Sequence, residues 1–283
     1  MNEPPKRGRF VPDIPGSEVN YRPCLCTLVD VLGFGALVQQ SVKSKEARNR
    51  IRFVLKKFEE NYHSKGISGD RVMSEPAVIV RHFSDLIARI VPLSARTLKN
   101  GSTEPVNLFE EILHEGIDLA AAQFSLLEEG ILVRGGLTLG ELYWEGNQIF
   151  GPALVRAYDL ERQLAHHPRI VVDSEIIQNL APKPKTSFFS WDTYFRQDFD
   201  GVWFVDYLSY FVAMSAPNIH FDREGYSSHF EDFRAFLIQE LSGREAISSR
   251  RSKYLWLATY YNSVIELAPK NSGIDWAELR ISI

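Results

Sequence analysis

Short apolar runs alternate with longer amphipathic segments along most of the chain. Residues 24–29 form a continuous apolar run that is too short for a helix and is followed by Asp30, Gly33 and Gly35. This pattern predicts a buried central strand that leads into a tight turn. Apolar positions then recur among Lys, Arg and Glu over residues 36–62, which predicts one helix.

Two hairpins and two further helices are expected in the middle of the chain. Residues 77–83 and 86–91 are β-rich and are separated by Ser84 and Asp85, which predicts a hairpin with a two-residue turn. The other predicted elements are a helix over 105–129, a glycine-rich hairpin over 131–144 and 148–150, a helix over 153–164, and strands over 169–172 and 201–207. The order predicts an α+β fold, with a mainly antiparallel central sheet and helices on one face.

The two ends of the chain differ from this body. Residues 1–20 hold four prolines and few large apolar residues, which predicts a flexible arm. The body is expected to span residues 21–210. Aromatic residues recur at helical spacing over 226–241 and 244–267, so residues 211–283 are predicted to form a helical C-terminal appendage.

Composition narrows the class of protein. The 283 residues carry a net charge of -4 and are 45% hydrophobic, which fits a globular protein and argues against nucleic-acid binding through bulk charge. No apolar run approaches the roughly 20 residues of a membrane-spanning helix. The N-terminus has no apolar signal region, so a cytoplasmic protein without membrane contact is expected. Cys24 and Cys26 are expected to share one face of a strand as small core residues.

Two isolated carboxylates stand at positions where metal-binding side chains are often found. Asp30 follows the first strand, and Asp85 lies at the tip of the next hairpin. Carboxylates at the rim of a sheet suit a divalent cation that carries a polyphosphate. Gly33 and Gly35 would let the backbone approach a phosphate, and the next helix would offer free N–H groups. Either Asp alone could instead cap a turn.

Several motifs together resemble the class III nucleotide cyclases, and in particular the bacterial Pycsar-type pyrimidine nucleotide cyclases. The matching segments are Asp30-Val-Leu-Gly-Phe34, Phe83-Ser-Asp85, Arg134-Gly-Gly-Leu-Thr-Leu-Gly140, and the stretches 149–154, 157–161 and 168–173. The resemblance implies a ferredoxin-like cyclase domain that works as a homodimer with active sites at the subunit interface. It also implies conversion of a pyrimidine nucleoside triphosphate into a 3′,5′-cyclic monophosphate, read by a separate effector in antiphage defence.

The resemblance also assigns roles to individual residues. Asp30 and Asp85, with the carbonyl of Val31, would bind two divalent ions, Mn²⁺ or Mg²⁺. The backbone amides around Gly33 and Phe34 would hold phosphate oxygens.

Two departures from the purine cyclases concern the base. Arg81 stands in place of a Lys, and Gln148 in place of a base-reading Asp. A guanidinium only donates hydrogen bonds, whereas an amide both donates and accepts, which suits the carbonyls and N3–H of uracil. UTP is therefore favoured over CTP. CTP stays open as an alternative because uracil and cytosine both carry the O2 acceptor. Arg81 could instead be an outward residue paired to an acid.

Two other departures concern catalysis. Val155 and Asp159 stand where the purine enzymes have a ribose-orienting Asn and a transition-state Arg. Another cation must then act, and Arg134 and Arg156 are the nearest candidates, with Arg134 preferred as the catalytic residue. A chain without such a cation would be a degenerate homologue that only binds a nucleotide.

Two conspicuous pairs are given structural interpretations. Gly135 and Gly136 are expected to allow close packing of the second hairpin. The pair His166 and His167 lacks a third ligand at suitable spacing, so a solvated helix end is expected there rather than a metal site.

Overall fold

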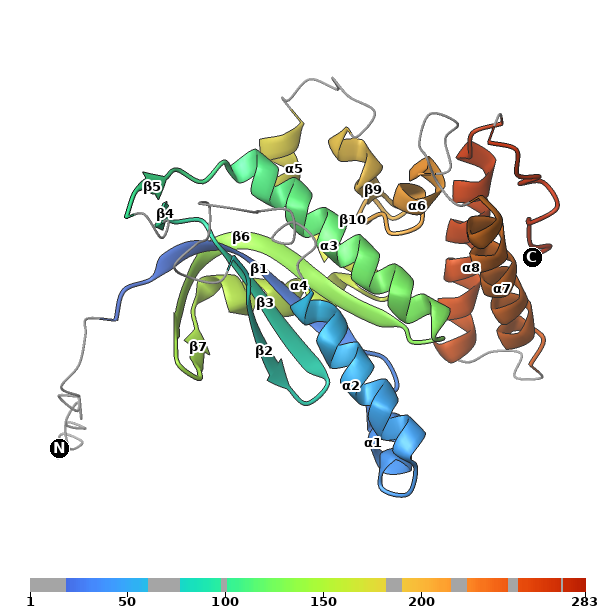
Figure 1. The fold of residues 1–283 in the computed structure, drawn as a ribbon, viewed down its shortest axis with the longest axis horizontal. Helices are drawn as coiled ribbons and strands as arrows, with labels where there is room; N and C mark the ends of the chain where they lie inside the picture. The colour runs from blue at the N-terminus through green and yellow to red at the C-terminus, as the bar shows by residue number, and fades with distance from the viewer. Residues whose placement is uncertain are drawn as a thin grey trace, which may run out of the picture.

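The chain folds around one twisted sheet that has helices on both faces (Figure 1). The structure, a computed structural model, describes residues 19–60, 77–97, 101–181, 190–214, 223–243, 249–270 and 272–283. The predicted arm lies almost wholly outside the described residues. No helix among the residues described is long and apolar enough to cross a membrane.

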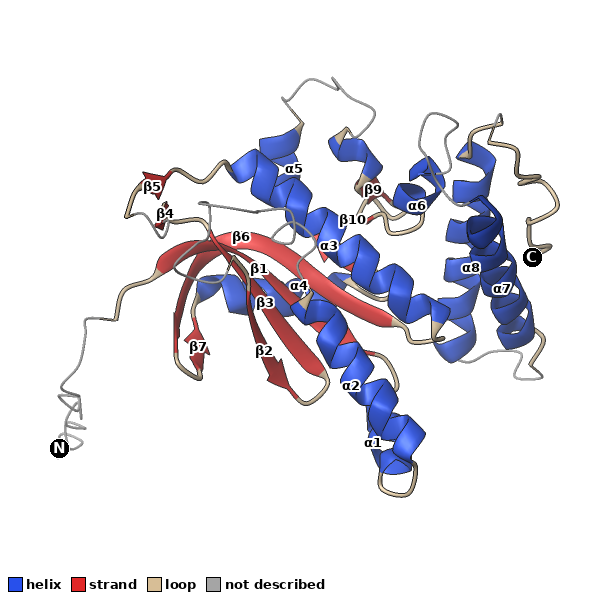
Figure 2. Ribbon diagram, in the orientation of Figure 1, coloured by secondary structure: helices blue, strands red, loops and turns tan. Residues whose placement is uncertain are grey.

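The sheet is mainly antiparallel (Figure 2). Its strands are β1 (Arg22–Val31), β2 (Ile79–Phe83), β3 (Leu86–Pro92), β6 (Val133–Glu145), β7 (Gln148–Phe150), β8 (Ile170–Val172), β9 (Phe195–Gln197) and β10 (Trp203–Val205). They lie in the order β2-β3-β1-β6-β8-β10-β9, with β7 paired to β6, and β6 and β8 run parallel. A separate pair is formed by β4 (Arg96–Thr97) and β5 (Thr103–Glu104), neither of which the sequence pattern predicted.

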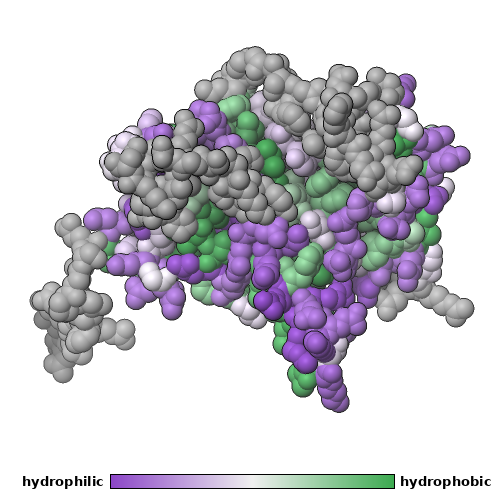
Figure 3. Space-filling model, in the orientation of Figure 1, coloured by the Kyte–Doolittle hydropathy of each residue, from purple (hydrophilic) through white to green (hydrophobic). Residues whose placement is uncertain are grey.

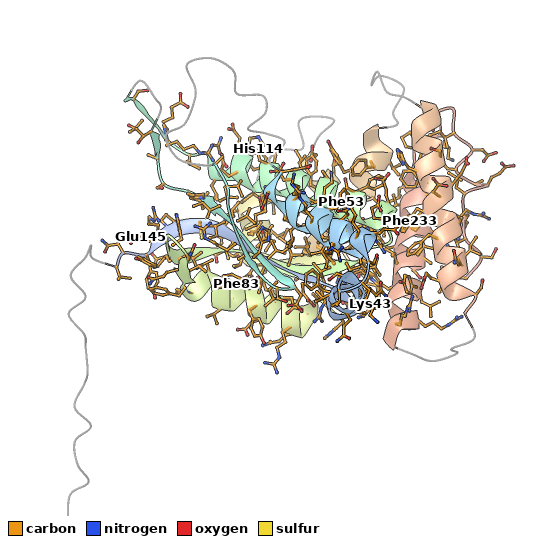
Figure 4. The ribbon with its side chains drawn as sticks, turned by 60° about the horizontal axis from the view of Figure 1, so that its bottom comes forward. Lys43, Phe53, Phe83, His114, Glu145 and Phe233 are labelled. Carbon is orange, nitrogen blue, oxygen red and sulfur yellow. The ribbon has the colours of Figure 1, made fainter. Side chains whose placement is uncertain are left out.

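The helices cover the sheet from two sides (Figure 4). They are α1 (Phe34–Ser41), α2 (Lys45–Glu59), α3 (Leu108–Glu128), α4 (Pro152–Leu164), α5 (Ser174–Leu180), α6 (Ser209–Met214), α7 (Arg223–Leu241) and α8 (Ser249–Leu267). The order β1, α1–α2, β2, β3, α3, β6 with sheet order β6-β1-β3-β2 is the ferredoxin-like topology. The predicted α+β fold is confirmed.

The prediction that helices lie on one face of the sheet is wrong. Helices α2 and α3 cover one face, while α4 packs on the opposite face against β6 and β1. Strand β1 therefore buries both of its faces: Leu25 and Val29 join the larger core, and Cys24, Cys26 and Leu28 join the core beneath α4. A strand buried on both sides produces the continuous apolar run seen in the sequence.

The single helix predicted over 36–62 is in fact two helices. The backbone of Ser44 is extended, and its hydroxyl oxygen accepts a hydrogen bond from the N–H of Ala47 at 3.1 Å. A serine N-cap of this kind starts a new helix, which amphipathic spacing alone does not reveal. The residues of the predicted helix beyond Glu60 lie outside the described part. The surface over α2 is mainly hydrophilic, whereas the end of α1 also exposes the apolar side chains of Val38 and Val42 (Figure 3).

The β6 glycines position α4. A Cβ built on Gly136 would lie 2.4 Å from the carbonyl oxygen of Ala157, and one on Gly140 would lie 3.2 Å from the Cβ of Ala153. A Cβ on Gly135 would meet the carbonyl oxygen of Leu28 at 2.4 Å. The predicted close packing at Gly135 and Gly136 is therefore confirmed.

The C-terminal helices pack on the body through aromatic side chains. Helices α7 and α8 contact each other, α7 contacts α3, and α8 contacts α6. Both helices end at the predicted residues, Leu241 and Leu267, and α7 starts three residues before the predicted range, at Arg223. Residues 244–248 of the other predicted range lie outside the described part. The ring of His167 stacks on Trp256 of α8 with centroids 5.3 Å apart. The solvated helix end predicted for the two histidines therefore holds for His166, which is exposed, but not for His167, which is half-buried against α8.

Candidate functional site

The end of β1 and the β2–β3 turn lie side by side. Asp30 pairs across the ladder with Leu86, the residue after Asp85, and the N–H of Val31 donates to the carbonyl of Asp85 at 3.2 Å. Ser84 adopts a φ of 65°, which closes the two-residue turn. The structure thus brings Asp30 and Asp85, 55 positions apart, to the same end of the sheet.

Asp30 faces the side of the sheet that α4 covers. Side chains alternate along a strand, so Asp30 follows Cys26 and Leu28 on that face. Its side chain is 14% exposed. The neighbour across the β1–β6 ladder is Arg134, whose Nε donates to Asp30 Oδ2 at 2.9 Å. Arg134, expected to replace the transition-state Arg, is therefore in direct contact with a predicted metal ligand.

A third side chain completes this cluster. Glu161 of α4 places its Oε1 2.8 Å from Arg134 Nη2, and its side chain is 5% exposed. The contact is close enough for an ion pair but lacks the alignment of a hydrogen bond, so Oε1 is a buried oxygen without a hydrogen-bond partner. Burial raises the pKa of Glu161, and the charge of Asp30 raises it further, while Arg134 opposes both effects.

Glu161 ends the 157–161 segment of the motif resemblance, which assigns it no role. The available signal was a carboxylate on the apolar side of a predicted helix, next to Leu160. A buried Glu requires a partner, and only the fold shows that the partner is Arg134, on the strand beneath.

The turn after β1 has the backbone geometry that a phosphate site needs. Gly33 has a φ of 78°, which favours glycine, and its carbonyl accepts from the N–H groups of Ala36 and Leu37 at 3.1 and 3.2 Å. Helix α1 starts at Phe34, which is buried. The N–H groups of Ala36 and Leu37 are thus engaged, so an anion at this helix start would be bound by the amides that precede them, those of Phe34 and Gly35.

Arg81 and Gln148 are also brought into one neighbourhood. Arg81 Nη2 donates to the carbonyl of Gly146 at 2.6 Å, in the β6–β7 turn, two residues before Gln148. Arg81 lies on the same face of β2 as Ile79 and Phe83, towards α4; Phe83 is labelled in Figure 4. Its Nη1 donates to the carbonyl of Val80, and its Nε is buried without a partner. Gln148 is exposed.

Arg156, the other candidate cation, is held elsewhere on α4. Its Nε and Nη2 donate to the two carboxylate oxygens of Asp173 at 2.7 and 3.0 Å. Thr138 also donates to Asp173, at 2.9 Å. Burial would raise the pKa of Asp173, but these hydrogen bonds outweigh it and lower the pKa. Val155 is 61% exposed on the outer face of the helix.

The donor set at the end of β1 fits a hard divalent cation. Carboxylate and carbonyl oxygens are the ligands of Mg²⁺, which keeps several waters and is bound through one or two carboxylates and substrate phosphates. Asp30, Asp85 and the Val31 carbonyl supply such oxygens. Among the described residues no group of three or more His, Cys, Asp or Glu side chains could hold a metal ion, so this site would depend on phosphate oxygens for further ligands.

Comparisons with known proteins give only a distant likeness. The sequence matches no family of known proteins and no curated protein. One similar solved structure, described as an adenylate/guanylate cyclase/hydrolase from Silicibacter pomeroyi, has 16% identity and a TM-score of 0.38, over 66% of this chain and 98% of that chain. A likeness at this level does not identify a family or a reaction, so both are inferred below from this chain's own residues.

Proposed function

We propose that this protein is a nucleotide cyclase that converts a pyrimidine nucleoside triphosphate into a 3′,5′-cyclic monophosphate and pyrophosphate. The observation that carries the proposal is the meeting of Asp30 and Asp85 at one end of the sheet, beside the Gly33 turn and Arg134. Two carboxylates, a glycine turn into a helix and a cation together suit a metal-bound triphosphate.

In this proposal each residue has a distinct task. Bound Mn²⁺ or Mg²⁺ would lower the pKa of the ribose 3′-hydroxyl and neutralise charge on the phosphates. Asp30, Asp85 and the Val31 carbonyl hold the ions, and amides around Gly33 and Phe34 orient phosphate oxygens. The 3′-oxygen forms a bond to the α-phosphorus as the bond to the pyrophosphate oxygen breaks, and the hydroxyl proton passes to solvent.

The choice of base rests on Arg81 and Gln148. Arg81 lies on the α4 side of β2 and reaches the β6–β7 turn, while Gln148 is exposed on β7 and alternates with Ile149, which packs on the α4 side. Their donors and acceptor favour uracil, so we expect a uridylate cyclase, with cytidylate cyclase activity as the closest alternative. The motif resemblance supports a homodimer and a role in antiphage defence, with a separate effector that reads cyclic UMP; we also expect a cytoplasmic location.

The test is turnover of four labelled nucleoside triphosphates by the purified chain with Mn²⁺. We expect cyclic UMP and pyrophosphate from UTP. Asp30→Asn and Asp85→Asn should each reduce turnover by at least a thousandfold without unfolding the chain, whereas Asp232→Asn, at an exposed position on α7, should leave it unchanged. Turnover retained in either of the first two variants would exclude the two-carboxylate site.

A second candidate function is nucleotide binding without turnover. It is favoured by Val155 and Asp159 on α4 and by the fact that Arg134 and Arg156 are both engaged by carboxylates. Binding of UTP in equilibrium dialysis, with no cyclic product from any triphosphate, would support this candidate over the cyclase.

A further inference from the structure

The buried carboxylate of Glu161 has no task in the function proposed above. Glu161 and Asp30 each form an ion pair with Arg134, so two carboxylates share one guanidinium. The distances are 2.9 Å from Nε to Asp30 and 2.8 Å from Nη2 to Glu161. Three buried or half-buried charges in contact carry a net charge of -1.

The fold holds Glu161 in this place. Gly136 lies two residues after Arg134 on the same face of β6, and a Cβ there would come within 3.1 Å of the backbone nitrogen of Glu161. The absence of a side chain at Gly136 therefore lets α4 approach the strand closely enough for Glu161 to contact Arg134. The packing of the helix, rather than a flexible surface contact, sets the distance.

The arrangement bears on how Asp30 can accept a cation. Arg134 already neutralises Asp30, so an arriving divalent ion competes with the guanidinium for the same carboxylate. The Arg134 side chain is 30% exposed, and a partly buried guanidinium that is left without a carboxylate is destabilised. Because Glu161 offers a second carboxylate, whose Oε1 lies 2.8 Å from Arg134 Nη2 and has no hydrogen-bond partner, Arg134 can stay paired with it when Asp30 binds an ion.

We propose that Glu161 is a positioning residue that retains Arg134 when a divalent cation binds Asp30. Glu161 lowers the free energy needed to break the ion pair between Asp30 and Arg134, and it keeps the guanidinium at the edge of the site. The inference rests on the proposed function, because it takes Asp30 to be a metal ligand. Glu161 acts through Arg134 and does not itself contact the ion.

A double-mutant cycle tests the proposal with a readout that needs no turnover. Mn²⁺ binding to the full-length chain, with a non-hydrolysable UTP analogue present to supply phosphate ligands, is measured by electron paramagnetic resonance for the wild type, Glu161→Gln, Arg134→Gln and the double variant. We expect Glu161→Gln to weaken Mn²⁺ binding about tenfold when Arg134 is present and less than about twofold in the Arg134→Gln background. Equal weakening in both backgrounds, or none in either, would overturn the proposal.

Two controls exclude a simple effect of charge. Glu161→Asp keeps the negative charge but shortens the reach to Arg134, so it should weaken binding as Glu161→Gln does; wild-type affinity in this variant would contradict the proposal. Glu175→Gln removes an exposed carboxylate on α5 and should leave Mn²⁺ affinity unchanged. Circular dichroism and thermal melting check that each variant is folded.

The outcome also separates the two proposals. Wild-type chain that binds Mn²⁺, loses it in Asp30→Asn and cyclises a triphosphate, but shows no coupling between Glu161 and Arg134, overturns the positioning role alone. Wild-type chain that neither binds Mn²⁺ nor turns over any triphosphate overturns the cyclase and the positioning role together.

Discussion

At the scale of single residues, Gly136 shows how the absence of a side chain determines the position of a helix. The backbone of α4 occupies the space that a Cβ would need. The sequence marks the position as glycine in a strand, which indicates a close approach, but it does not say what approaches. The structure identifies α4 as the partner and links this glycine to the site through Glu161.

Gly136→Ala should therefore destabilise the protein. The new methyl group would lie 2.4 Å from the Ala157 carbonyl oxygen and 2.6 Å from the Leu160 Cβ, so α4 must shift. We expect a loss of about 1–3 kcal/mol in the free energy of unfolding, measured by urea denaturation. Gly35→Ala is the matched control, since nothing lies within 4 Å of a Cβ built there; equal losses in the two variants would refute the steric explanation.

The two cysteines allow a second prediction at this scale. Burial raises the pKa of Cys24 to about 12 and raises that of Cys26 further. Thiolates are the reactive species, so neither residue should react with a disulfide reagent at pH 8 in the folded chain, and both should react in urea. Rapid labelling of the native protein would contradict the burial of this face of β1.

At the scale of elements, a buried ionic cluster joins the sheet, α3 and the end of α2. Arg89 of β3 donates from Nε to both oxygens of Glu115 at 3.0 and 2.9 Å, from Nη2 to Asp118, and from Nη1 to the carbonyls of Phe58 and Glu60. The side chains of Arg89, Glu115 and Asp118 are almost fully buried. This cluster fixes α2 and α3 against the sheet opposite α4.

Arg89→Met should cost about 3–5 kcal/mol of unfolding free energy, because it leaves two buried carboxylates without their cation. Burial already raises the pKa of Glu115, and loss of Arg89 removes the group that opposes this rise. A carboxyl whose pKa is higher in the folded than in the unfolded state binds a proton more tightly in the folded state. The unfolding free energy lost in Arg89→Met should therefore shrink as the pH falls from 8 to 5. Denaturant titrations across that range measure it.

The triple variant Arg89→Met, Glu115→Gln, Asp118→Asn provides the control for this cluster. It removes the stranded charges, so we expect it to recover part of the stability lost in Arg89→Met and to lose the pH dependence. A deficit in Arg89→Met that is constant with pH would show that lost packing, rather than unpaired charge, causes the effect.

Several elements could be predicted from the sequence, and others could not. The hairpins, α3, α4 and the two C-terminal helices follow from periodicity and turn residues, which act locally. The break at Ser44 was missed because an N-cap serine looks like any polar residue in an amphipathic segment. Strand β9 and helices α5 and α6 are three to seven residues long, too short to show a period.

At the scale of the whole molecule, the C-terminal helices are connected to the site's own elements through Arg169. Its guanidinium binds Asp198 and Asp200 in the β9–β10 turn and the carbonyl of Leu164 at the end of α4. Trp256 of α8 donates from its indole nitrogen to Asp198 at 2.7 Å. The N–H of Gly135, next to Arg134, donates to the carbonyl of Arg169 at 3.1 Å.

Trp256→Phe should loosen α8 from the body. It removes a hydrogen bond to a charged acceptor, which is worth about 1.5–3 kcal/mol, while it keeps most of the aromatic packing. We expect faster hydrogen exchange in residues 249–267 and a lower melting temperature. Trp276→Phe, which loses only a bond to the neutral Ser272 hydroxyl, should have a smaller effect; unchanged exchange in α8 would show that this link does not anchor the helix.

The sequence by itself determined which local elements present the candidate site residues. Strand, turn and helix patterns are local, so Asp30 at the end of a strand, Asp85 in a turn and the glycines after Asp30 could be identified without a fold. Only the tertiary structure decided what these residues contact. That α4 crosses to the far face of the sheet, and that Glu161 and Asp30 share Arg134, depends on contacts between segments that lie 27 positions apart (Arg134 and Glu161) and 104 positions apart (Asp30 and Arg134), for which no local pattern exists.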